Sequence, residues 1–397
     1  MRPYSLYFSS LLVSFVLSLS ACTTPTEPTK VPPSGGGEAS VPPSRTFLRK
    51  DFADLPGWDK DRIVEAWPAF VHSCQVLKKL DEWRQTCLMA EKVNADDGGQ
   101  VRAFLETALE PWQVVLSDGN DTGMTTGYYE PLLYGSRKKS AQYQTPLYGV
   151  PDDLIVVDLA ANYPRLKGLR LRGRLDGRRL VPYSSRGEIR KSGHLAGKEI
   201  VWVTDPVDAF FLQVQGSGRV RIAETGETIR VAYAEQNGHP YRSIGRYLVD
   251  RGALKLEEAS AQGIKKWLSD NPTRFNEVLD ANPSYVFFRE EKLENQEIGP
   301  KGALGVPLTG GRSVAVDPQH IPLGVPLFID TTEPNSDIPL QRMVLAQDTG
   351  GAIKGELRLD YFWGFGSEAG EMAGKMKQPV RIWVLLPKNE KEKSPSF

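Results

Sequence analysis

The spacing of apolar positions changes along this chain. From Leu55 to Leu109, apolar residues recur three and four positions apart, which predicts amphipathic helices. Beyond Gly123 the apolar runs are short and separated by turn residues, a pattern typical of β-strands. The predicted strands include Leu154–Val157, Ile200–Val203, Phe211–Gln215 and Arg219–Ile222. Leu169–Gly177, which lies between them, is rich in arginine and indicates a solvated hairpin.

Helical spacing returns in the middle of the chain, before a second β region. The expected helices are Pro240–Arg251, Glu257–Ser269 and Phe275–Leu279. Strand-like runs resume at Tyr285–Phe288 and continue to Leu386. The 37 glycines and 29 prolines suit many strands joined by turns better than they suit a helical bundle. The sequence therefore predicts a mainly β fold with helices, of the α+β class, for a chain long enough to form two domains.

The N-terminus has the features of a targeting segment. Arg2 precedes a short apolar stretch, Leu11–Leu19, which is too short to span a bilayer comfortably, so residues 1–21 read as a signal peptide. The stretch ends Leu-Ser-Ala-Cys and resembles a bacterial lipobox, which implies a lipid on Cys22; Thr23 after it favours the outer membrane. An ordinary signal peptide with an incidental cysteine is the alternative. Residues 22–45 are rich in proline and glycine and predict an extended tether.

Charge and cysteine content narrow the choice of function. The 49 basic and 49 acidic residues balance, so nothing in the composition favours nucleic acid as a partner. Cys74 and Cys87 both lie in the helical region from about Asp59 to Val93. A disulfide between two packed helices is the favoured interpretation, and two unpaired buried thiols are the alternative. The four histidines are scattered and no Cys/His cluster has metal spacing, so we expect neither a metal nor a cofactor.

Three aspartates in the last third of the chain are the candidate chemistry. Asp317, Asp348 and Asp360 each close an apolar, strand-like run, and the last two bracket the glycine-rich loop Thr349–Gly355. Like charges held close together cannot all ionise, so one carboxyl can keep its proton near neutral pH and act as an acid. The competing interpretation is that these aspartates cap turns at strand ends.

Five motifs, taken in order, resemble the membrane-bound lytic transglycosylase A family. They are GYYEP (127–131), FFLQVQGSGRV (210–220), PLTGGRSVAVDP (307–318), IPLG (321–324) and AQDTGGAIKGELRLDYFWG (346–364). The C-terminal motifs also resemble the wider three-aspartate domain family, whose aspartates match Asp317, Asp348 and Asp360. The resemblance covers Leu55 to Leu386.

The resemblance implies cleavage of the β-1,4 bond between N-acetylmuramic acid and N-acetylglucosamine in peptidoglycan strands. The muramic C6 hydroxyl attacks its own C1, which leaves a 1,6-anhydro end. Asp348 matches the family's catalytic aspartate and would serve first as general acid and then as general base, with a pKa raised toward neutrality. Asp317 and Asp360 would orient or tune it; Asp360 could instead pair with Arg358 or Lys354 on a surface.

Polar and aromatic residues of the other motifs are candidates for substrate binding. Period-two alternation predicts a strand with Gln213 and Gln215 on one open face, followed by Ser217. Tyr128 and Tyr129 could stack on sugar rings, and Thr126 could contact the reacting sugar. The alternative for the two glutamines and Ser217 is a solvated edge strand. The alternative for the tyrosines is that one of them packs into the core. Glu130, before Pro131, suits a domain junction better than catalysis. Trp363 and Phe365 are expected in the core.

The resemblance also sets the expected architecture. Residues 46–131 and 284–388 would form one discontinuous domain, a double-psi β-barrel with N-terminal helices. Residues 132–283 would form an inserted, smaller β-barrel domain, with a substrate groove between the two, and residues 389–397 a frayed tail. The expected location is the outer membrane, with the protein facing the periplasm. Proteins of cell-wall remodelling are possible partners there. Two alternative functions remain open. One is an inverting glycoside hydrolase that uses Asp317 or Asp360 as the base, and the other is a non-catalytic glycan-binding lipoprotein.

Overall fold

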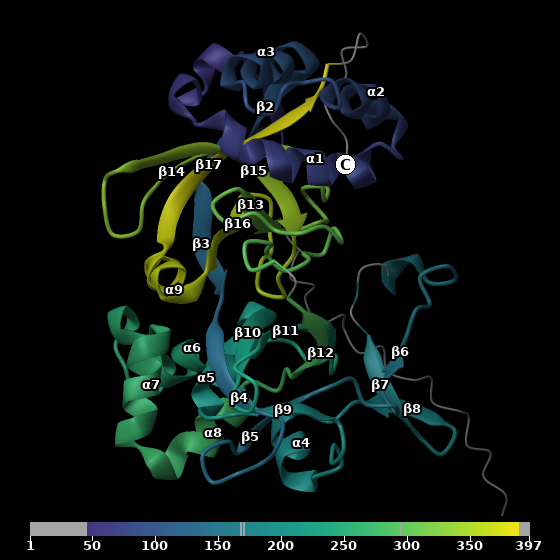
Figure 1. Ribbon diagram of the computed structural model, residues 1–397, viewed down its shortest axis with the longest axis vertical. Coiled ribbons are helices and arrows are strands. Elements are labelled where there is room, and N and C mark those ends of the chain that lie inside the picture. Colours follow the sequence, from purple (N-terminus) through teal and green to yellow (C-terminus); the bar gives the residue numbers. More distant parts are fainter. Residues whose placement is uncertain (1–45, 167–168, 170, 294, 389–397) are drawn as a thin grey trace, which may run out of the picture. The chain divides into compact units, whose positions relative to one another are not determined.

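The computed structural model describes residues 46–166, 169, 171–293 and 295–388 (Figure 1). The predicted signal peptide, the lipidated Cys22, the tether up to residue 45 and the tail 389–397 lie outside the described residues. In the described part of the chain, no helix combines the length and apolar character needed to cross a bilayer.

The N-terminal part is helical, as its apolar spacing predicts. Its elements are β1 (Thr46–Arg49), the 3-10 turns η1 (Phe52–Asp54), η2 (Trp58–Lys60) and η3 (Ile63–Ala66), and the helices α1 (Trp67–Leu77), α2 (Asp81–Ala90) and α3 (Gly98–Ala108). Pro68 lies in the first turn of α1, where its missing N–H costs no hydrogen bond. Asp97 caps α3 by accepting from the N–H groups of Gly99 and Gln100.

The largest sheet collects strands from both ends of the described chain. Its order is β1-β2-β17-β14-β15-β13-β16-β3, and β3 also pairs with β17. Six strands, from β17 to β3, therefore form a closed ring, which leaves none of them as a free edge. The strands are β2 (Leu109–Val115), β3 (Gly123–Glu130), β13 (Ser313–Val316), β14 (Pro326–Thr332), β15 (Pro339–Asp348), β16 (Arg358–Phe365) and β17 (Lys377–Pro387), with helix α9 (Gly366–Lys375) between the last two.

The intervening residues build a second sheet of order β12-β11-β10-β4-β9-β5 and a small third sheet, β6-β7-β8. The strands are β4 (Leu132–Ser136), β5 (Thr145–Tyr148), β6 (Ile155–Val156), β7 (Arg172–Asp176), β8 (Arg179–Pro182), β9 (Glu199–Val203), β10 (Ser217–Ile222), β11 (Thr228–Gln236) and β12 (Val286–Lys292). The helical elements are η4 (Pro164–Leu166), α4 (Arg186–Ser192), α5 (Pro206–Gln215), α6 (Ile244–Asp250), η5 (Leu256–Glu258), α7 (Ala261–Asp270), η6 (Pro272–Arg274) and α8 (Phe275–Asp280). The fold thus mixes helix and sheet in two sheet-rich domains, whereas a double-psi topology stays a prediction.

One predicted strand is wrong. Phe211–Gln215 belongs to helix α5, not to a strand. The helix begins with Asp205, whose carboxylate accepts from the N–H of Val207, followed by Pro206 in the first turn. It ends at Gly216, which has a φ of 82°. These start and stop signals outweigh the short period-two alternation within the helix.

The main core joins the helical part to the closed sheet. Phe70 and Leu105 of the helices are buried in one cluster with Leu327 and Phe328 of β14, and α1 packs against β15. Each such fully buried side chain contributes about 1.5–3 kcal/mol. The strand that will carry the candidate acid is therefore supported on one side by a helix.

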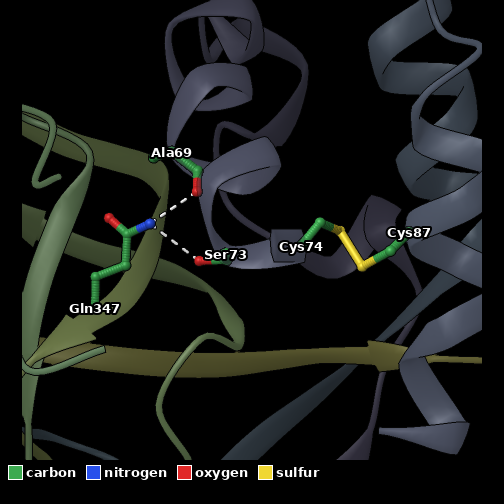
Figure 2. Close-up of a disulfide and its surroundings, with 5 residues drawn as sticks. All are labelled: Ala69, Ser73, Cys74, Cys87 and Gln347. Carbon is green, nitrogen blue, oxygen red and sulfur yellow. Dashed lines mark hydrogen bonds between the residues drawn. A yellow bond between two sulfur atoms is a disulfide. The ribbon is translucent and has the colours of Figure 1, made fainter. Parts of the chain in front are cut away.

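A disulfide and an amide hold this helix in place (Figure 2). Cys74 of α1 and Cys87 of α2 are joined in a disulfide across the two helices. One turn away, the buried side-chain amide of Gln347 donates to the Ala69 carbonyl and to the Ser73 hydroxyl, at 2.7 and 3.0 Å. Gln347 lies on β15, so α1 is bound covalently to α2 and by hydrogen bonds to the sheet.

Candidate active site

Two of the three aspartates lie level with each other on the strands that flank β13. In β13, Ala315 pairs in register with Asp348 of β15 on one side and with Asp360 of β16 on the other. Residues level across a sheet project from the same face, and two strand spacings separate the Cα atoms by roughly 10 Å. The register of β15 shifts between Ala346 and Asp348, so Gln347 is the extra residue of a β-bulge. This bulge lets Gln347 face α1 while Asp348 faces the site.

Asp348 receives two hydrogen bonds from well-separated parts of the chain. The Tyr128 hydroxyl donates to Oδ2 at 3.0 Å, and the Ala303 N–H donates to Oδ1 at 2.9 Å. Tyr128 is 8% exposed. Burial, followed by the nearby charges of Asp348 and Asp360, raises the pKa of the Tyr128 hydroxyl well above its usual value, so the phenol stays a donor. The carboxylate is therefore oriented at both oxygens.

Asp360 is the second carboxyl of this pair and, like Asp348, is half-buried. Its Oδ1 accepts from the Thr126 hydroxyl at 2.6 Å, and that hydroxyl in turn accepts from Arg358 at 2.7 Å. Burial raises the pKa of Asp360 to about 6, and the charge of Asp348 acts in the same direction, against the Thr126 hydrogen bond and Arg358. Asp360 therefore keeps its proton to a higher pH than an ordinary aspartate does.

Arg358 is a site residue whose contact the sequence analysis missed. The sequence predicts it only as a surface partner of Asp360, but it donates to Thr126 and stands two residues before Asp360 on β16. Because an arginine can only donate, the Thr126 hydroxyl must direct its own proton to Asp360. The two-residue spacing along a strand was the available signal. The Ala303 amide left no signal, since any residue supplies an N–H.

Asp317 has a different environment from the other two aspartates. It is buried, accepts from the Gly355 N–H at 3.0 Å and from the Gln319 N–H at 3.3 Å, and lies 3.6 Å from the Lys354 ammonium. These contacts fasten the loop that follows Asp348. Lys354 therefore pairs with Asp317, whereas the sequence had offered it as a partner for Asp360. Turn capping, the competing interpretation, describes the contacts of Asp317.

The motif of the two glutamines is divided between the site wall and the interior. The Gln215 side chain accepts from the Tyr129 N–H at 3.0 Å, and Ser217 reaches Glu130 at 3.4 Å. Gln213, by contrast, is 7% exposed and accepts from the buried Arg186 at 2.7 Å. The prediction that Gln213 lies on an open face is wrong, because in a helix residues two apart point in different directions. Tyr129 remains half-buried beside Gly370.

Glu130 is the centre of a buried ion-pair cluster. Its carboxylate is bonded to the guanidinium groups of Arg219, at 2.9 Å, and of Arg230, and all three side chains are almost fully buried. A carboxylate between two guanidinium groups is unsuited to act as an acid. Glu130 lies at the end of β3, where β16 pairs with it at Phe365. The interpretation of Glu130 as structural therefore agrees with its contacts.

Trp363 and Phe365 have different surroundings, although both were expected in the core. Trp363 packs against the main core and donates to Met376. Phe365 is 44% exposed, and the Arg219 guanidinium lies 3.7 Å from its ring centroid, so the core prediction for Phe365 is wrong. Together they help to line a pocket of ≈ 270 Å³, formed by Glu130, Glu297, Gly299, Leu308, Gly310, Phe362, Trp363, Gly364 and Phe365.

Two protein-family models match this chain. A family model described as the MltA specific insert domain matches residues 124–289, and one described as the 3D domain matches residues 312–386. The Escherichia coli K12 protein named membrane-bound lytic murein transglycosylase A is 35% identical over 297 residues, 72% of each chain. The Vibrio cholerae protein of the same name is 30% identical over 303 residues, 75% of this chain and 74% of the relative.

Solved structures show the same fold. MltA from Neisseria gonorrhoeae superposes with a TM-score of 0.77 at 39% identity, over 89% of this chain and 95% of that one. LtgG, a lytic transglycosylase of Burkholderia pseudomallei, is 44% identical with a TM-score of 0.59, over 88% and 99%. Escherichia coli MltA with bound chitohexaose has a TM-score of 0.65 at 27% identity, over 87% and 95%. The chain belongs to the membrane-bound lytic murein transglycosylase A family.

Proposed function

We propose that this protein is a peptidoglycan lytic transglycosylase that cleaves the β-1,4 bond between N-acetylmuramic acid and N-acetylglucosamine. Membership of the family supports the activity. The observation that carries the assignment to a site is the pair of carboxylates, Asp348 and Asp360, level with Ala315 on neighbouring strands. The chitohexaose named with the Escherichia coli structure supports a β-1,4-linked amino-sugar chain as the class of ligand.

Asp348 acts as the single acid and base in this proposal. It gives its proton to the glycosidic oxygen as the bond to C1 breaks, so N-acetylglucosamine leaves with a free hydroxyl. The muramic C6 hydroxyl then adds to C1 and returns its proton to Asp348, which leaves a 1,6-anhydro end and consumes no water. The substrate supplies its own nucleophile, so the two-carboxylate arrangement of ordinary glycosidases is not required.

The surroundings of Asp348 suit it to this role better than those of the other carboxylates. Asp348 is half-buried at the end of β15 and leads into Gly350 and Gly351, where the backbone leaves room for a sugar. Tyr128 and Ala303 orient it. Asp360 acts through Asp348 as a half-buried second carboxyl, whose own pKa is raised by burial and by the charge of Asp348. Asp317 positions the loop after Asp348 through Gly355.

The wall of the site offers several contacts for glycan. Tyr129, Gln215 and Ser217 are half-buried and present an aromatic ring, an amide and a hydroxyl, the groups that recognise sugars. Thr126 and Tyr128 contact the carboxylates directly, so we assign them to the reacting sugar's side of the site. We place these contacts in a groove between the domain 46–131 plus 284–388 and the inserted domain 132–283. A lipid on Cys22 would hold the enzyme at the outer membrane, facing the periplasm, where protein partners in wall remodelling can join it.

Digestion of purified sacculi tests the proposal. Asp348→Asn keeps the size of the side chain but cannot donate a carboxyl proton, so release of soluble fragments should fall at least about a hundredfold. Wild-type fragments should carry anhydro ends in their mass spectra. Arg62→Ala, at an exposed ion pair of the helical part, is a matched control and should keep full turnover.

Three outcomes would contradict the proposal. Retained turnover in a folded Asp348→Asn enzyme would remove Asp348 from the reaction. Reducing ends on the wild-type fragments would indicate capture by water, and therefore the inverting hydrolase. Glycan that binds but keeps its length would indicate the non-catalytic alternative.

A further inference from the structure

Exposed apolar side chains gather on one small part of the molecule. Of the 21 large hydrophobic side chains that are exposed among the described residues, a third fall between residues 150 and 180, around the third sheet. Singly exposed apolar residues are ordinary, whereas a contiguous group marks a surface that another body covers. These side chains are Val150, Val156, Leu159, Tyr163, Leu169, Leu175 and Leu180.

Strand register places two of them, Leu175 and Leu180, on one face of the β7–β8 hairpin. Leu175 pairs directly with Leu180, and the next residues of the same face are Gly173, Ile155 and Pro182. Leu175 is 60% exposed and Leu180 is 48% exposed. The face is therefore apolar from its base to its tip, and the two leucines at the tip form a pair turned toward solvent.

The base of this hairpin is attached firmly to the second sheet. Arg172 of β7 forms an ion pair with Glu235 of β11 at 2.9 Å, and both side chains are largely buried. The Gly238 backbone approaches Arg172 so closely that an added Cβ would lie 2.8 Å from the arginine Cβ. The Tyr183 hydroxyl donates to Asp153 at 2.9 Å beneath the hairpin. The exposure of the tip is therefore a property of an anchored element.

The tip is basic as well as apolar. The sequence at the turn is Asp176-Gly177-Arg178-Arg179, and Gly177 has the positive φ, 58°, that a tight hairpin needs. Both arginines are exposed, and no ion pair or hydrogen bond joins either side chain to another residue in the described part of the chain. Arg179 pairs with Asp176 on the face opposite Leu175 and Leu180, and Arg178 lies in the turn, so the two arginines flank the apolar pair at the tip.

We propose that the β7–β8 hairpin docks the enzyme on an anionic phospholipid surface. Leu175 and Leu180 enter the boundary between headgroups and acyl chains, and Arg178 and Arg179 bind the phosphates. A phospholipid surface supplies an apolar phase and a layer of negative charge at the same depth. The acidic peptides of peptidoglycan would satisfy the arginines but leave the leucine pair in water, so the lipid surface fits the face better.

This docking would fix the orientation of the enzyme at the membrane. Residues 22–45 between the proposed lipid and the first strand can span up to about 80 Å when extended, so an anchor alone sets distance but not direction. The hairpin adds a second, weaker attachment on the body itself. The inference goes beyond glycan cleavage and does not depend on it, because the hairpin contains none of the proposed site residues.

A fluorescent label at the tip tests the proposal on the mature full chain. Asp176→Cys, labelled with nitrobenzoxadiazole, should show blue-shifted emission and protection from iodide on phosphatidylethanolamine–phosphatidylglycerol vesicles, and neither on phosphatidylcholine vesicles. The wild-type chain, treated identically, gives the background. Adding Arg178→Glu and Arg179→Glu should weaken docking by at least about tenfold, since each basic residue near an anionic surface contributes about fivefold. Adding Leu175→Ser and Leu180→Ser should abolish the shift.

A second hairpin provides the matched control. Asp337 lies exposed in the acidic turn between β14 and β15, and the same label at Asp337→Cys should stay fully accessible to iodide. A shift at both labels, or at neither, overturns the proposal. The proposal is also overturned if the blue shift at Asp176→Cys is the same on charged and uncharged vesicles and is unchanged by Arg178→Glu and Arg179→Glu. Glycan cleavage by the Leu175→Ser, Leu180→Ser enzyme should remain at the wild-type rate on solubilised glycan, which separates loss of docking from loss of catalysis.

Discussion

The half-buried carboxyl of Asp360 lowers the stability of the fold when it ionises. Burial raises its pKa to about 6, from an ordinary value of 3.8. The folded protein therefore binds this proton more tightly than the unfolded chain does. The penalty for ionising Asp360 is absent below about pH 4, grows between the two pKa values, and is complete above about pH 6.

Asp360→Asn should relieve that penalty. Its amide oxygen can still accept from Thr126, but the side chain never ionises, so the variant should gain stability over wild type as pH rises. By pH 7 the gain should be on the order of 3 kcal/mol, measured as the free energy of urea unfolding, and it should disappear near pH 4. If the difference in unfolding free energy between Asp360→Asn and wild type did not change with pH, the charge of Asp360 would already be compensated in the folded protein.

Asp97→Asn is a control with the opposite sign. Hydrogen bonds from Gln100 and Gly99, stronger together than the effect of burial, lower the pKa of Asp97 at the start of α3. Its charge stabilises the fold above its ordinary pKa, and the benefit is lost as the pH falls. The neutral variant should therefore be less stable than wild type at pH 7 and should approach it on acidification.

Some site residues could be predicted from the sequence and others could not. Asp348 could be identified because carboxylates at strand ends beside glycines are recognisable in the chain itself, and the resemblance pointed to the same position. Gln213 could not be placed, because its role depends on Arg186, a residue 27 positions away that fills the interior beneath it. The Ala303 amide also depends on the fold alone. Contacts made by backbone atoms cannot be predicted from residue type, because nearly every residue supplies the same backbone groups.

At the scale of elements, the end of β3 depends on a buried ionic cluster. Glu130 closes the strand, and the guanidinium groups of Arg219 on β10 and Arg230 on β11 surround it. The cluster therefore joins the last residue of the strand that carries Thr126 and Tyr128 to two strands of the second sheet. Such clusters add little net stability while intact, but breaking one leaves charges without partners.

Glu130→Ala should be strongly destabilising. Two guanidinium groups that are almost fully buried would lose their shared counter-charge, so the free energy of unfolding should fall by about 3–5 kcal/mol. Denaturant titration followed by tryptophan fluorescence measures the loss. Glu290→Ala removes the carboxylate of the half-exposed pair with Arg137 and should cost no more than about 1 kcal/mol. Equal losses in the two variants would contradict this account of the cluster.

Element prediction succeeded where residue spacing and turn residues indicated the same element, and failed where they indicated different elements. The helices before Leu109, the arginine-rich hairpin and the β10 strand all follow from spacing and turn residues. Five residues of α5 alternate in a way that also fits a strand, and only the flanking Asp205-Pro206 and Gly216 decide between them. The closed ring of β3 with β17 joins residues about 250 positions apart, and no local pattern can encode such a pairing.

At the scale of the whole molecule, the disulfide supports the helical part. The bond closes a loop between Cys74 and Cys87, 13 residues apart, and so restricts the unfolded chain. Changing both cysteines to serine should lower the free energy of unfolding by about 2–4 kcal/mol. The midpoint of denaturant unfolding, measured with and without reductant, checks this: reductant should shift wild type toward the variant and leave the variant unchanged. A wild-type midpoint that reductant leaves in place would contradict it.

The position of the disulfide has a consequence for the timing of activity. Cys74 follows Ser73, which receives the Gln347 amide, and Gln347 precedes the proposed acid Asp348 (Figure 2). In the proposed location, the chain is synthesised among reduced thiols and meets oxidant only after export. The strand that carries Asp348 would then gain its full support only after export. The enzyme would therefore be less active before it reaches its substrate.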